Sequence, residues 1–202
     1  MENYSTNETL KTIYQRRSIR QFQDMPIPDS LIQAVLDAAN QAPSAHNQQS
    51  WKFVIIRDQK KQELARLVSQ KAAGFPKPSA SILRMAGRSI GSAPVVIAAM
   101  NTGTLINHGT ELFKIEEDVS KDFFRTMEIQ SSAAAVENLL LAATALGLGS
   151  VWLGVLFLIK ADVLSFLGEA QGEFMAVIPL GYPRKEHASP KKQALEYVVK
   201  YL

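Results

Sequence analysis

The stretch "KDFFRTMEIQSSAAAVENLLLAATALG", from Lys121 to Gly147, is the longest helical pattern in the chain. Its alanine-rich and nearly all-round apolar character predicts a central helix that neighbouring elements surround. Gly147 and Gly149 are expected to end this helix, because glycine readily adopts the left-handed conformation of a helix C-cap. The rest of the fold is therefore expected to assemble around this helix.

Helices and strands follow one another on both sides of the central segment. Runs of β-branched and aromatic residues predict buried strands, and apolar residues at helical spacing predict helices. Asn7 suits an N-cap and Pro28 suits a first helical turn. Prolines are expected to break regular structure over 74–80, and weak signals predict a loop or short insertion from Thr102 to Glu117. The chain therefore reads as mixed α and β, with helices over 7–17, 27–42, 59–73, 81–91, 121–147 and 159–168, and strands over 51–58, 94–100, 150–156 (a short strand or loop), 174–183 and 194–202 (a last strand or an extended tail).

The composition is that of a soluble globular protein, with 47% hydrophobic and 20% charged residues. A chain of 202 residues is expected to form one sizeable core, so we predict a single domain over residues 1–202. The absence of cysteine excludes disulfides and thiolate chemistry. No apolar signal segment or membrane-length apolar run is found, so a cytoplasmic protein without a membrane partner is expected. The net charge of +3 is compatible with an anionic ligand or nucleic acid and selects neither.

Three arginines and a serine crowd one short segment, as Arg16, Arg17, Ser18 and Arg20. Guanidinium groups and a hydroxyl supply the charge-assisted hydrogen-bond donors that a phosphate requires. The alternative is a solvated helix end, where each arginine offsets the helix dipole by about 0.3–1 kcal/mol. Taken alone, the cluster favours this alternative.

The segment "APSAHNQQSW", from Ala42 to Trp51, joins an expected helix to an expected strand. Its small and amide-bearing side chains suit contact with a planar heteroaromatic ring. It reads equally well as a helix stop followed by a polar turn. His46 by itself is most simply a solvent-facing loop residue.

Three glycines lie in "ALGLGSVWLG", from Ala145 to Gly154. Glycine allows a ligand to approach the backbone closely, so an amide here would be able to face a ring nitrogen. The spacing differs from that of a dinucleotide-binding fingerprint, and the segment leaves a helix instead of entering one. The alternative is a helix C-cap followed by a core strand.

A second basic cluster near the C-terminus consists of Arg184, Lys185, Lys191 and Lys192. Such a cluster is usually a solvated face, but beside Arg16 to Arg20 it would complete an anion site. Scattered histidines and the lack of cysteine argue against a metal, and neither a GxSxG elbow nor a Walker A loop is found. Basic residues mostly alternate with acidic ones, which disfavours nucleic acid as a partner.

The order of these segments resembles the nitroreductase family of FMN-dependent oxidoreductases. The motifs that carry the resemblance are Arg-Arg-Ser-Ile-Arg at 16–20, the run from "PIPDSL" through "APSAHNQQSWKFVII", then "ALGLGSVWLG" and "IPLGYPRKE". The combination of Arg-Arg-Ser-x-Arg with Ala-Pro-Ser-x-x-Asn-x-Gln-x-Trp is quite specific. The match runs roughly from Leu10 to Val199, with no motif over 71–88 or 102–117.

The resemblance implies an α+β sandwich with a central, mostly antiparallel sheet flanked by helices. It also implies an intertwined homodimer with an FMN at each of two interface sites, for which the alanine-rich helix supplies a close-packing surface. One protomer would hold the FMN phosphate and part of the flavin's polar edge, and its partner would reach the same flavin through a loop. The FMN-binding residues implied are Arg16, Arg17, Ser18 and Arg20; Pro43, Ser44, Ala45 and Asn47 from the partner; Gln130; Leu153 and Gly154, with an amide near flavin N5; and Lys192, where the family usually has arginine and where Lys191 is an alternative.

The implied function is transfer of a hydride from NADH or NADPH, through flavin N5, to an electron-poor small molecule such as a nitroaromatic compound or a quinone. The flavin carries the chemistry, so no catalytic side chain is expected. A lid over the flavin is expected within 75–88 or 102–118. The alternatives are a specialised relative that dehalogenates or fragments a substrate or reduces an enone, and a flavin-binding protein without turnover.

Overall fold

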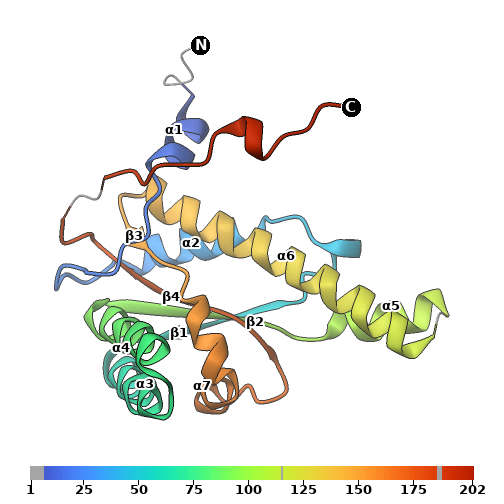
Figure 1. Cartoon of the computed structure of the whole chain (residues 1–202), viewed down its shortest axis with the longest axis horizontal. Helices are drawn as coiled ribbons and strands as arrows, with labels where there is room; N and C mark the ends of the chain where they lie inside the picture. The colour runs from blue at the N-terminus through green and yellow to red at the C-terminus, as the bar shows by residue number, and fades with distance from the viewer. Residues whose placement is uncertain (1–6, 115, 186–187) are drawn as a thin grey trace.

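The centre of the molecule is a four-stranded sheet. The computed structural model describes residues 7–114, 116–185 and 188–202, and its strand order is β1-β2-β4-β3. All three strand pairings are antiparallel, with Trp51 opposite Asn101 and Val95 opposite Leu180. The predicted α+β fold with a mostly antiparallel sheet is confirmed. The strands are β1 (Trp51–Ile56), β2 (Val95–Asn101), β3 (Gly149–Ser150) and β4 (Glu173–Gly181) (Figure 1).

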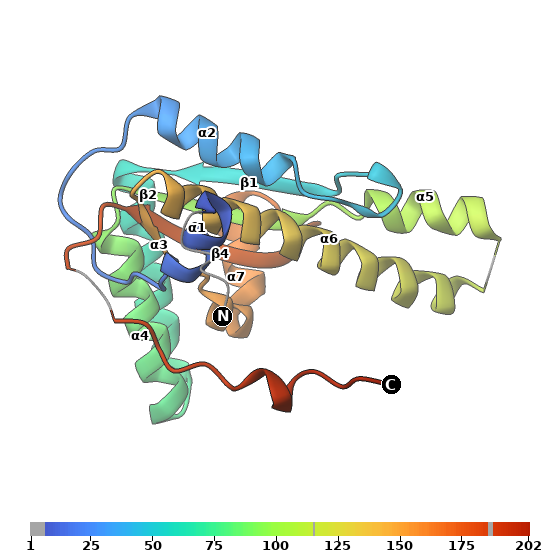
Figure 2. The same cartoon turned by 90° about the horizontal axis from the view of Figure 1, so that it is seen from above.

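Helices cover both faces of the sheet because alternate residues of its strands are apolar on both sides. On β2, Val95 and Ile97 pack into one hydrophobic cluster, while Val96 and Ala98 pack into the other. All of β2 is buried, as predicted, whereas β1 is an edge strand that buries only its two end residues. One face carries α2 (Asp29–Asn40) and α6 (Glu117–Ala145), and the other carries α3 (Asp58–Lys71), α4 (Lys77–Ser92) and α7 (Lys160–Leu167) (Figures 1 and 2).

Local sequence signals set several helix ends. Asn7 caps α1 (Glu8–Gln15), since its side-chain oxygen accepts from the backbone N–H of Leu10 at 3.0 Å. Gly147 follows α6 with a φ of 75°, the left-handed conformation that was expected. The break predicted over 74–80 is wrong from Lys77 onward, because Pro78 lies in the first turn of α4, where its missing N–H leaves no helical bond unmade.

The loop predicted from Thr102 to Glu117 is wrong, because its first part forms a helix, α5 (Thr104–Phe113). The fully buried Glu128 of α6 accepts from the Leu105 N–H at 2.8 Å and so caps α5. Gly109 lets the two helices approach, since a Cβ there would lie 2.3 Å from the ring of Phe124. These contacts come from distant residues, so local patterns did not reveal the helix. Together α5 and the first turns of α6 form an arm that projects from the body (Figure 1).

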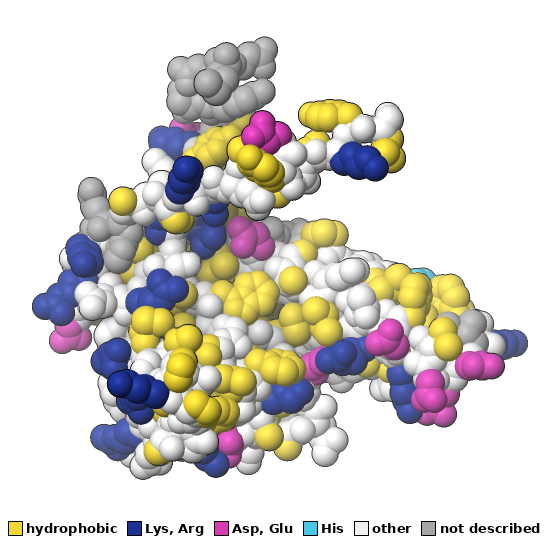
Figure 3. Space-filling view, in the orientation of Figure 1, with side chains coloured by type: hydrophobic (Ala, Val, Ile, Leu, Met, Phe, Trp, Pro, Cys, Tyr) yellow, Lys and Arg dark blue, Asp and Glu magenta, His cyan; other side chains and the backbone are white. Residues whose placement is uncertain are grey.

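The C-terminal segment leaves the body as an extended tail, as predicted for 194–202 (Figures 1 and 2). It contains one short 3-10 turn, η5 (Leu195–Tyr197), and all its described residues are exposed. Leu195, Tyr197 and Tyr201 expose 75%, 72% and 92% of their surfaces, and apolar side chains are visible along the tail and on the arm in Figure 3. Among the described helices, none has the length and apolarity that crossing a bilayer requires.

Candidate functional site

The segment from Arg16 to Gln23 is fixed by its backbone against the sheet. The Ile19 N–H donates to the carbonyl of Ser150 at 2.9 Å. The Gln23 N–H donates at 2.9 Å to the carbonyl of Tyr182, which directly follows β4. Gly149 makes this approach possible, because a Cβ there would lie 2.7 Å from the Ile19 side chain. The segment is therefore a rigid strip whose polar side chains project outward.

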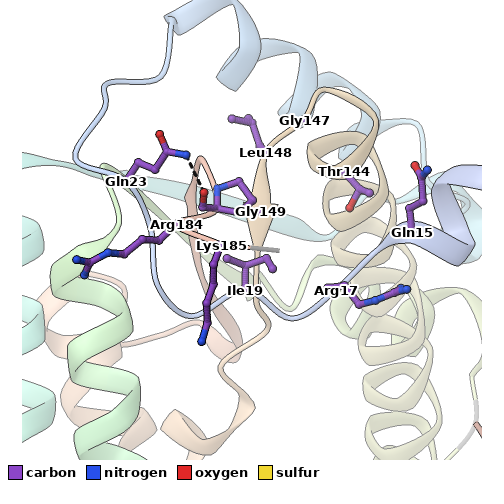
Figure 4. Close-up of a pocket in the computed structure, with 11 residues that line it drawn as sticks. Gln15, Arg17, Ile19, Gln23, Thr144, Gly147, Leu148, Gly149, Arg184 and Lys185 are labelled. Atoms are coloured by element: carbon purple, nitrogen blue, oxygen red, sulfur yellow. Dashed lines mark hydrogen bonds between the residues drawn. The ribbon is translucent and has the colours of Figure 1, made fainter. Parts of the chain in front are cut away.

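Arg17 turns back onto the helix that precedes it. Its Nη1 donates to the carbonyls of Tyr14 at 2.6 Å and Arg16 at 2.8 Å, so it satisfies acceptors at the C-terminus of α1. Figure 4 shows Arg17 on the α1 side of a cavity of about 740 Å³, with Arg184 extending the opposite way, toward α4. The helix-end interpretation of the basic cluster therefore holds for Arg17.

The other predicted anion-binding residues gather around a second cavity, of about 620 Å³. This cavity lies between the strip and the C-terminal tail, and these two segments are separated in sequence by more than half of the chain. Arg16 also has an acidic neighbour there, since its Nε lies 3.7 Å from a carboxylate oxygen of Glu137. Of the two lysines considered, Lys192 and not Lys191 is among the described lining residues. The predicted residues that line this cavity are Arg16, Arg17, Ser18, Arg20 and Lys192.

A third cavity, of about 460 Å³, adjoins the second because Ser18 and Arg20 line both. Arg88 of α4 lines it as well, together with Arg184 and Lys185. Among the described residues, neither Arg20 nor Arg88 forms a salt bridge within 4.0 Å. The two cavities therefore form a cationic region around Ser18 that suits an anionic, oxygen-rich ligand.

Arg88 was not predicted from the sequence as a site residue. The signal lay in the helical spacing of α4, where Met85, Arg88, Ser89 and Ser92 line the cavity at intervals of one turn or less. Ser89, at 1% exposure, interrupts an otherwise apolar buried side of α4, and its exposed neighbour Arg88 lies at the edge of that side. A polar residue at the edge of a buried helix face is a reason to expect a site.

The three glycines of 145–154 have different roles. Gly147 ends α6 and Gly149 admits Ile19, so the structural explanation accounts for both. Gly154 is different, since its φ is not in the left-handed region and a Cβ there would approach Trp152 no closer than 3.6 Å. Neither backbone conformation nor packing within the protomer requires glycine at 154, so the backbone there is open to close approach of a ligand.

Leu153 and Gly154 also differ in the state of their backbone amides. The Leu153 N–H donates to the carbonyl of Val177 at 3.0 Å, and its side chain is buried. Gly154 is exposed and begins the 3-10 helix η4 (Gly154–Ile159), so its N–H has no acceptor within that helix. Of the two predicted residues, Gly154 is the one with an amide suited to a ligand.

The loop from Pro43 to Gln49 is strained. His46, Asn47 and Gln49 all have positive φ angles, of 53°, 53° and 48°. Each such residue costs on the order of 1 kcal/mol in an L-amino acid. A tertiary contact holds the loop in place, because the Ala45 N–H donates to Oγ of Ser131 on α6 at 3.1 Å. Strain of this kind concentrates at functional sites, so the loop is a second candidate region.

The strip and the loop do not meet within one protomer. Ser131, which anchors the loop, precedes Glu137, which faces Arg16, by about 9 Å along α6. Gln130, expected to face inward, is exposed next to Ser131 and so accompanies the loop. The described residues that line the two cavities of the strip include none of Pro43, Ser44, Ala45, Asn47 and Gln130.

Known proteins are similar to this chain in sequence and in fold. The sequence profile described as the Nitroreductase family matches residues 13–182. A protein of Archaeoglobus fulgidus, provisionally named NADH dehydrogenase/NAD(P)H nitroreductase, is 36% identical over 184 residues, 89% of this chain and 87% of that one. The 5,6-dimethylbenzimidazole synthase of Rhodospirillum rubrum is 28% identical, over 95% of this chain and 90% of its own. A crystal structure from Desulfovibrio desulfuricans, provisionally described as a nitroreductase in complex with FMN, is 30% identical with a TM-score of 0.71, over 97% of this chain and 98% of that one. The family match and the identity to these relatives show that the chain belongs to the nitroreductase family.

Proposed function

We propose that this protein is an FMN-dependent oxidoreductase that transfers a hydride from NADH or NADPH to an electron-poor acceptor such as a nitroaromatic compound or a quinone. For a quinone, the balanced reaction converts NAD(P)H, a proton and the quinone to NAD(P)⁺ and the hydroquinone. The observation that carries the proposal is the pair of adjoining cavities that share Ser18 and Arg20. Their cations come from four separate segments of the chain, which a merely solvated basic face does not require.

The donor set of these cavities fits FMN. Arg16, Ser18 and Lys192 would hold the phosphate, where lysine acts as a point charge without the fork of an arginine. Arg20 and Arg88 would donate to the carbonyl-bearing edge of the flavin. Arg17 would contribute mainly by fixing the end of α1, since its Nη1 already serves two carbonyls. Bound FMN would supply the redox chemistry by accepting a hydride from the nicotinamide and passing it to the acceptor.

The backbone of Gly154 would serve the flavin ring. Its amide is suited to donate a hydrogen bond to N5, while the amide of Leu153 is occupied by Val177. The side chain of Leu153 would instead fix the backbone next to Gly154 by packing into the core. No side chain need act as a nucleophile.

A homodimer completes the proposed site. The strip and the loop lie apart in one protomer, so the loop residues Pro43, Ser44, Ala45 and Asn47 are proposed to reach the FMN held by the partner's strip. The unpartnered surfaces support this arrangement. An apolar groove of about 420 Å³ runs between α1, α2 and α6, and the tail exposes Leu195 and Tyr197. A second copy of the chain would cover both.

The chain is proposed to act as one domain over residues 1–202. The two larger hydrophobic clusters share the same sheet, which supports a single folding unit. A cytoplasmic location goes with this proposal, because that is where nicotinamide donors are regenerated.

The proposal is tested with purified protein loaded with FMN. The flavin absorbance is expected to bleach when NADH or NADPH is added without air, and to recover when a quinone or nitroaromatic compound follows. Protein that takes up no FMN would contradict the proposal. Protein that binds FMN but is not bleached would identify a flavin-binding protein without turnover, and bleaching without recovery on these acceptors would favour a specialised relative.

The matched pair Arg88 and Arg84 tests the site itself. Arg88→Ala is expected to weaken FMN binding by about 1.5–3 kcal/mol, the value of a hydrogen bond to a charged group. Arg84→Ala, one turn earlier on α4 and exposed, is expected to leave the Kd of FMN unchanged. Equal Kd values for both variants, measured by fluorescence titration, would remove Arg88 from the site.

A further inference from the structure

A further cationic cavity lies beside the proposed FMN site. It is the cavity of about 740 Å³ that Arg17, Arg184 and Lys185 line, and we call it the outer cavity (Figure 4). Its described lining residues include no aspartate and no glutamate. A cleft lined by charges of one sign attracts an anion. Neither Arg184 nor Lys185 is among the proposed contacts of FMN, so the outer cavity is suited to a second anionic ligand.

The segment that carries Arg184 and Lys185 is fixed to the strip. The backbone N–H of Arg184 donates to the carbonyl of Gln21 at 3.1 Å. Nε2 of Gln23 donates to the carbonyl of Pro183 at 2.8 Å, and Figure 4 shows this hydrogen bond. The backbone of the two cations is therefore ordered in the protomer, so little ordering of it remains when a ligand binds.

The structure gives these cations no acidic partner. Among the residues that it describes, neither Arg17, Arg184 nor Lys185 forms a salt bridge within 4.0 Å. The Nε of Arg17 is buried and has no hydrogen-bond acceptor in the same part of the chain. Arg184 and Lys185 also line the third cavity together with Arg20 and Arg88. Like charges gathered around one cavity repel each other, and an anion between them removes that cost.

The chemistry of the proposed reaction indicates which anion this is. Simple quinones and nitroaromatic compounds carry no net charge, whereas NADH and NADPH both carry a diphosphate. NADPH carries one more phosphate, on the 2′-oxygen of its adenosine. In dinucleotide-binding folds an acidic residue on this ribose goes with NAD, and an arginine near it accommodates the 2′-phosphate of NADP. The described lining of the outer cavity has the arginine and lacks the acid.

We propose that the outer cavity binds the adenosine 2′-phosphate of NADPH, and that Arg184 and Lys185 thereby select NADPH over NADH. This proposal rests on the proposed function, in which the flavin ring lies beside Gly154. The guanidinium of Arg184 binds two oxygens of the 2′-phosphate, and the ammonium of Lys185 adds a point charge.

One dinucleotide is able to reach both places. Gly149 lines the outer cavity, and Gly154 lies five residues further along the chain, so the two are at most about 18 Å apart by chain length alone. An extended dinucleotide spans a distance of that order. Its nicotinamide would therefore reach the flavin ring while its adenosine end lies against Arg184.

The experiment compares three variants of the FMN-loaded protein: Arg184→Ala, Lys185→Ala and the control Arg84→Ala. Arg84 suits the control because it is exposed like the other two, loses the same charge, and lines neither the outer cavity nor the third one. Calorimetry measures the binding of adenosine 2′,5′-bisphosphate and of 5′-AMP to the oxidised protein. Neither probe carries a nicotinamide, so the measurement is independent of turnover. The KM values for NADPH and NADH with a quinone, and the Kd of FMN, are measured on the same samples.

The wild type is expected to bind the bisphosphate about tenfold more tightly than 5′-AMP and to have a lower KM for NADPH than for NADH. Arg184→Ala and Lys185→Ala are each expected to weaken binding of the bisphosphate, and to raise the KM for NADPH, by about tenfold, since each removes a hydrogen bond to a charged group. Binding of 5′-AMP, the KM for NADH and the Kd of FMN are expected to match the wild type. Arg84→Ala is expected to match it in every measurement.

Three results would overturn the assignment of the outer cavity. The first is a wild type that binds both probes equally or has the lower KM for NADH. The second is unchanged binding of the bisphosphate in both variants, and the third is an equal loss for both probes together with a weaker Kd of FMN. Wild-type protein that takes up FMN and is bleached by either donor shows that the proposed function holds in all three cases. Wild-type protein that takes up no FMN ends the proposed function, and the assignment of the outer cavity with it.

Discussion

The strip from Arg16 to Gln23 and the loop from Pro43 to Gln49 differ in how the chain holds them. The strip is paired by backbone hydrogen bonds to β3 and the end of β4, and its side chains line cavities within the protomer. The loop has three left-handed residues and is hydrogen-bonded to α6 through Ser131. The strip therefore lines cavities of its own protomer, while the loop lines neither of these two cavities and leaves Asn47 and Gln49 exposed.

This difference suggests a division of labour between two copies of the chain. A ligand that needs many cations benefits from a rigid, preorganised region, because little ordering remains to be done on binding. A region that acts on another protomer's ligand must project, and strain is tolerated there because the surrounding structure enforces it. The strip is accordingly proposed to hold the phosphate of FMN, and the loop is proposed to reach the FMN held by the partner's strip.

The largest effect is expected from mixing two defective chains. Arg20→Glu would repel the anionic cofactor from the strip, and Asn47→Trp would fill the space that the loop offers to the partner's ligand. Each variant alone is expected to retain almost no FMN. Coexpressed with different affinity tags and purified as a mixed dimer, they are expected to recover about half of the wild-type FMN content, since one of the two sites would then be intact.

The control for this experiment is a mixed dimer in which one chain carries both changes and the other carries neither. Each of its sites would contain one defect, so it is expected to stay empty. If the first mixture also stays empty while both mixtures form dimers, the strip and the loop do not serve one cofactor. Recovery in the control but not in the first mixture would show that each protomer builds its site alone.

Much of the sheet could be predicted because local sequence patterns mark its strands. Val95 to Met100 is an unbroken buried run, and the helices beside it have clear apolar faces. The arm could not be predicted, since α5 depends on Glu128 and Phe124, which lie in the next helix, α6. The same limit applies to the site. Arg16 to Arg20 was found from a motif, but Arg88 joins it only through the tertiary packing of α4.

Substitutions at two glycines separate the folding stability of the strip from the binding of FMN. Gly149→Ala would place a Cβ 2.7 Å from Ile19, so the fold is expected to lose about 1–3 kcal/mol through overpacking, and FMN affinity is expected to fall with it. Gly154→Ala meets no atom closer than 3.6 Å, so the free energy of unfolding is expected to stay within about 0.5 kcal/mol of the wild type. Its FMN affinity is nevertheless expected to fall, because the added methyl group occupies the space left for the ring.

Denaturant unfolding of the FMN-free proteins and FMN titration of the same samples measure the two quantities separately. The comparison would fail if Gly154→Ala bound FMN as tightly as the wild type. It would also fail if Gly149→Ala kept full stability, because the close approach of Ile19 to β3 would then not hold the strip.

The smallest effect concerns Glu128, which supports the arm and therefore the loop but not the strip. Burial raises the pKa of this carboxyl above its ordinary value of 4.5, and its Oε2 has no hydrogen-bond partner among the described residues. The folded state then binds more protons than the unfolded state as pH rises from about 4.5 toward the raised pKa, so the wild type loses stability across that interval.

Glu128→Gln does not titrate, and its side-chain oxygen can still accept from Leu105. Thermal melts from about pH 4 to about pH 8 are expected to show the variant gaining on the wild type as pH rises, while the Kd of FMN follows the wild type throughout. A stability difference that is constant with pH, or that favours the wild type at the upper end, would mean that Glu128 is charged and stabilised in the fold, and that the arm is held by an ionic cap.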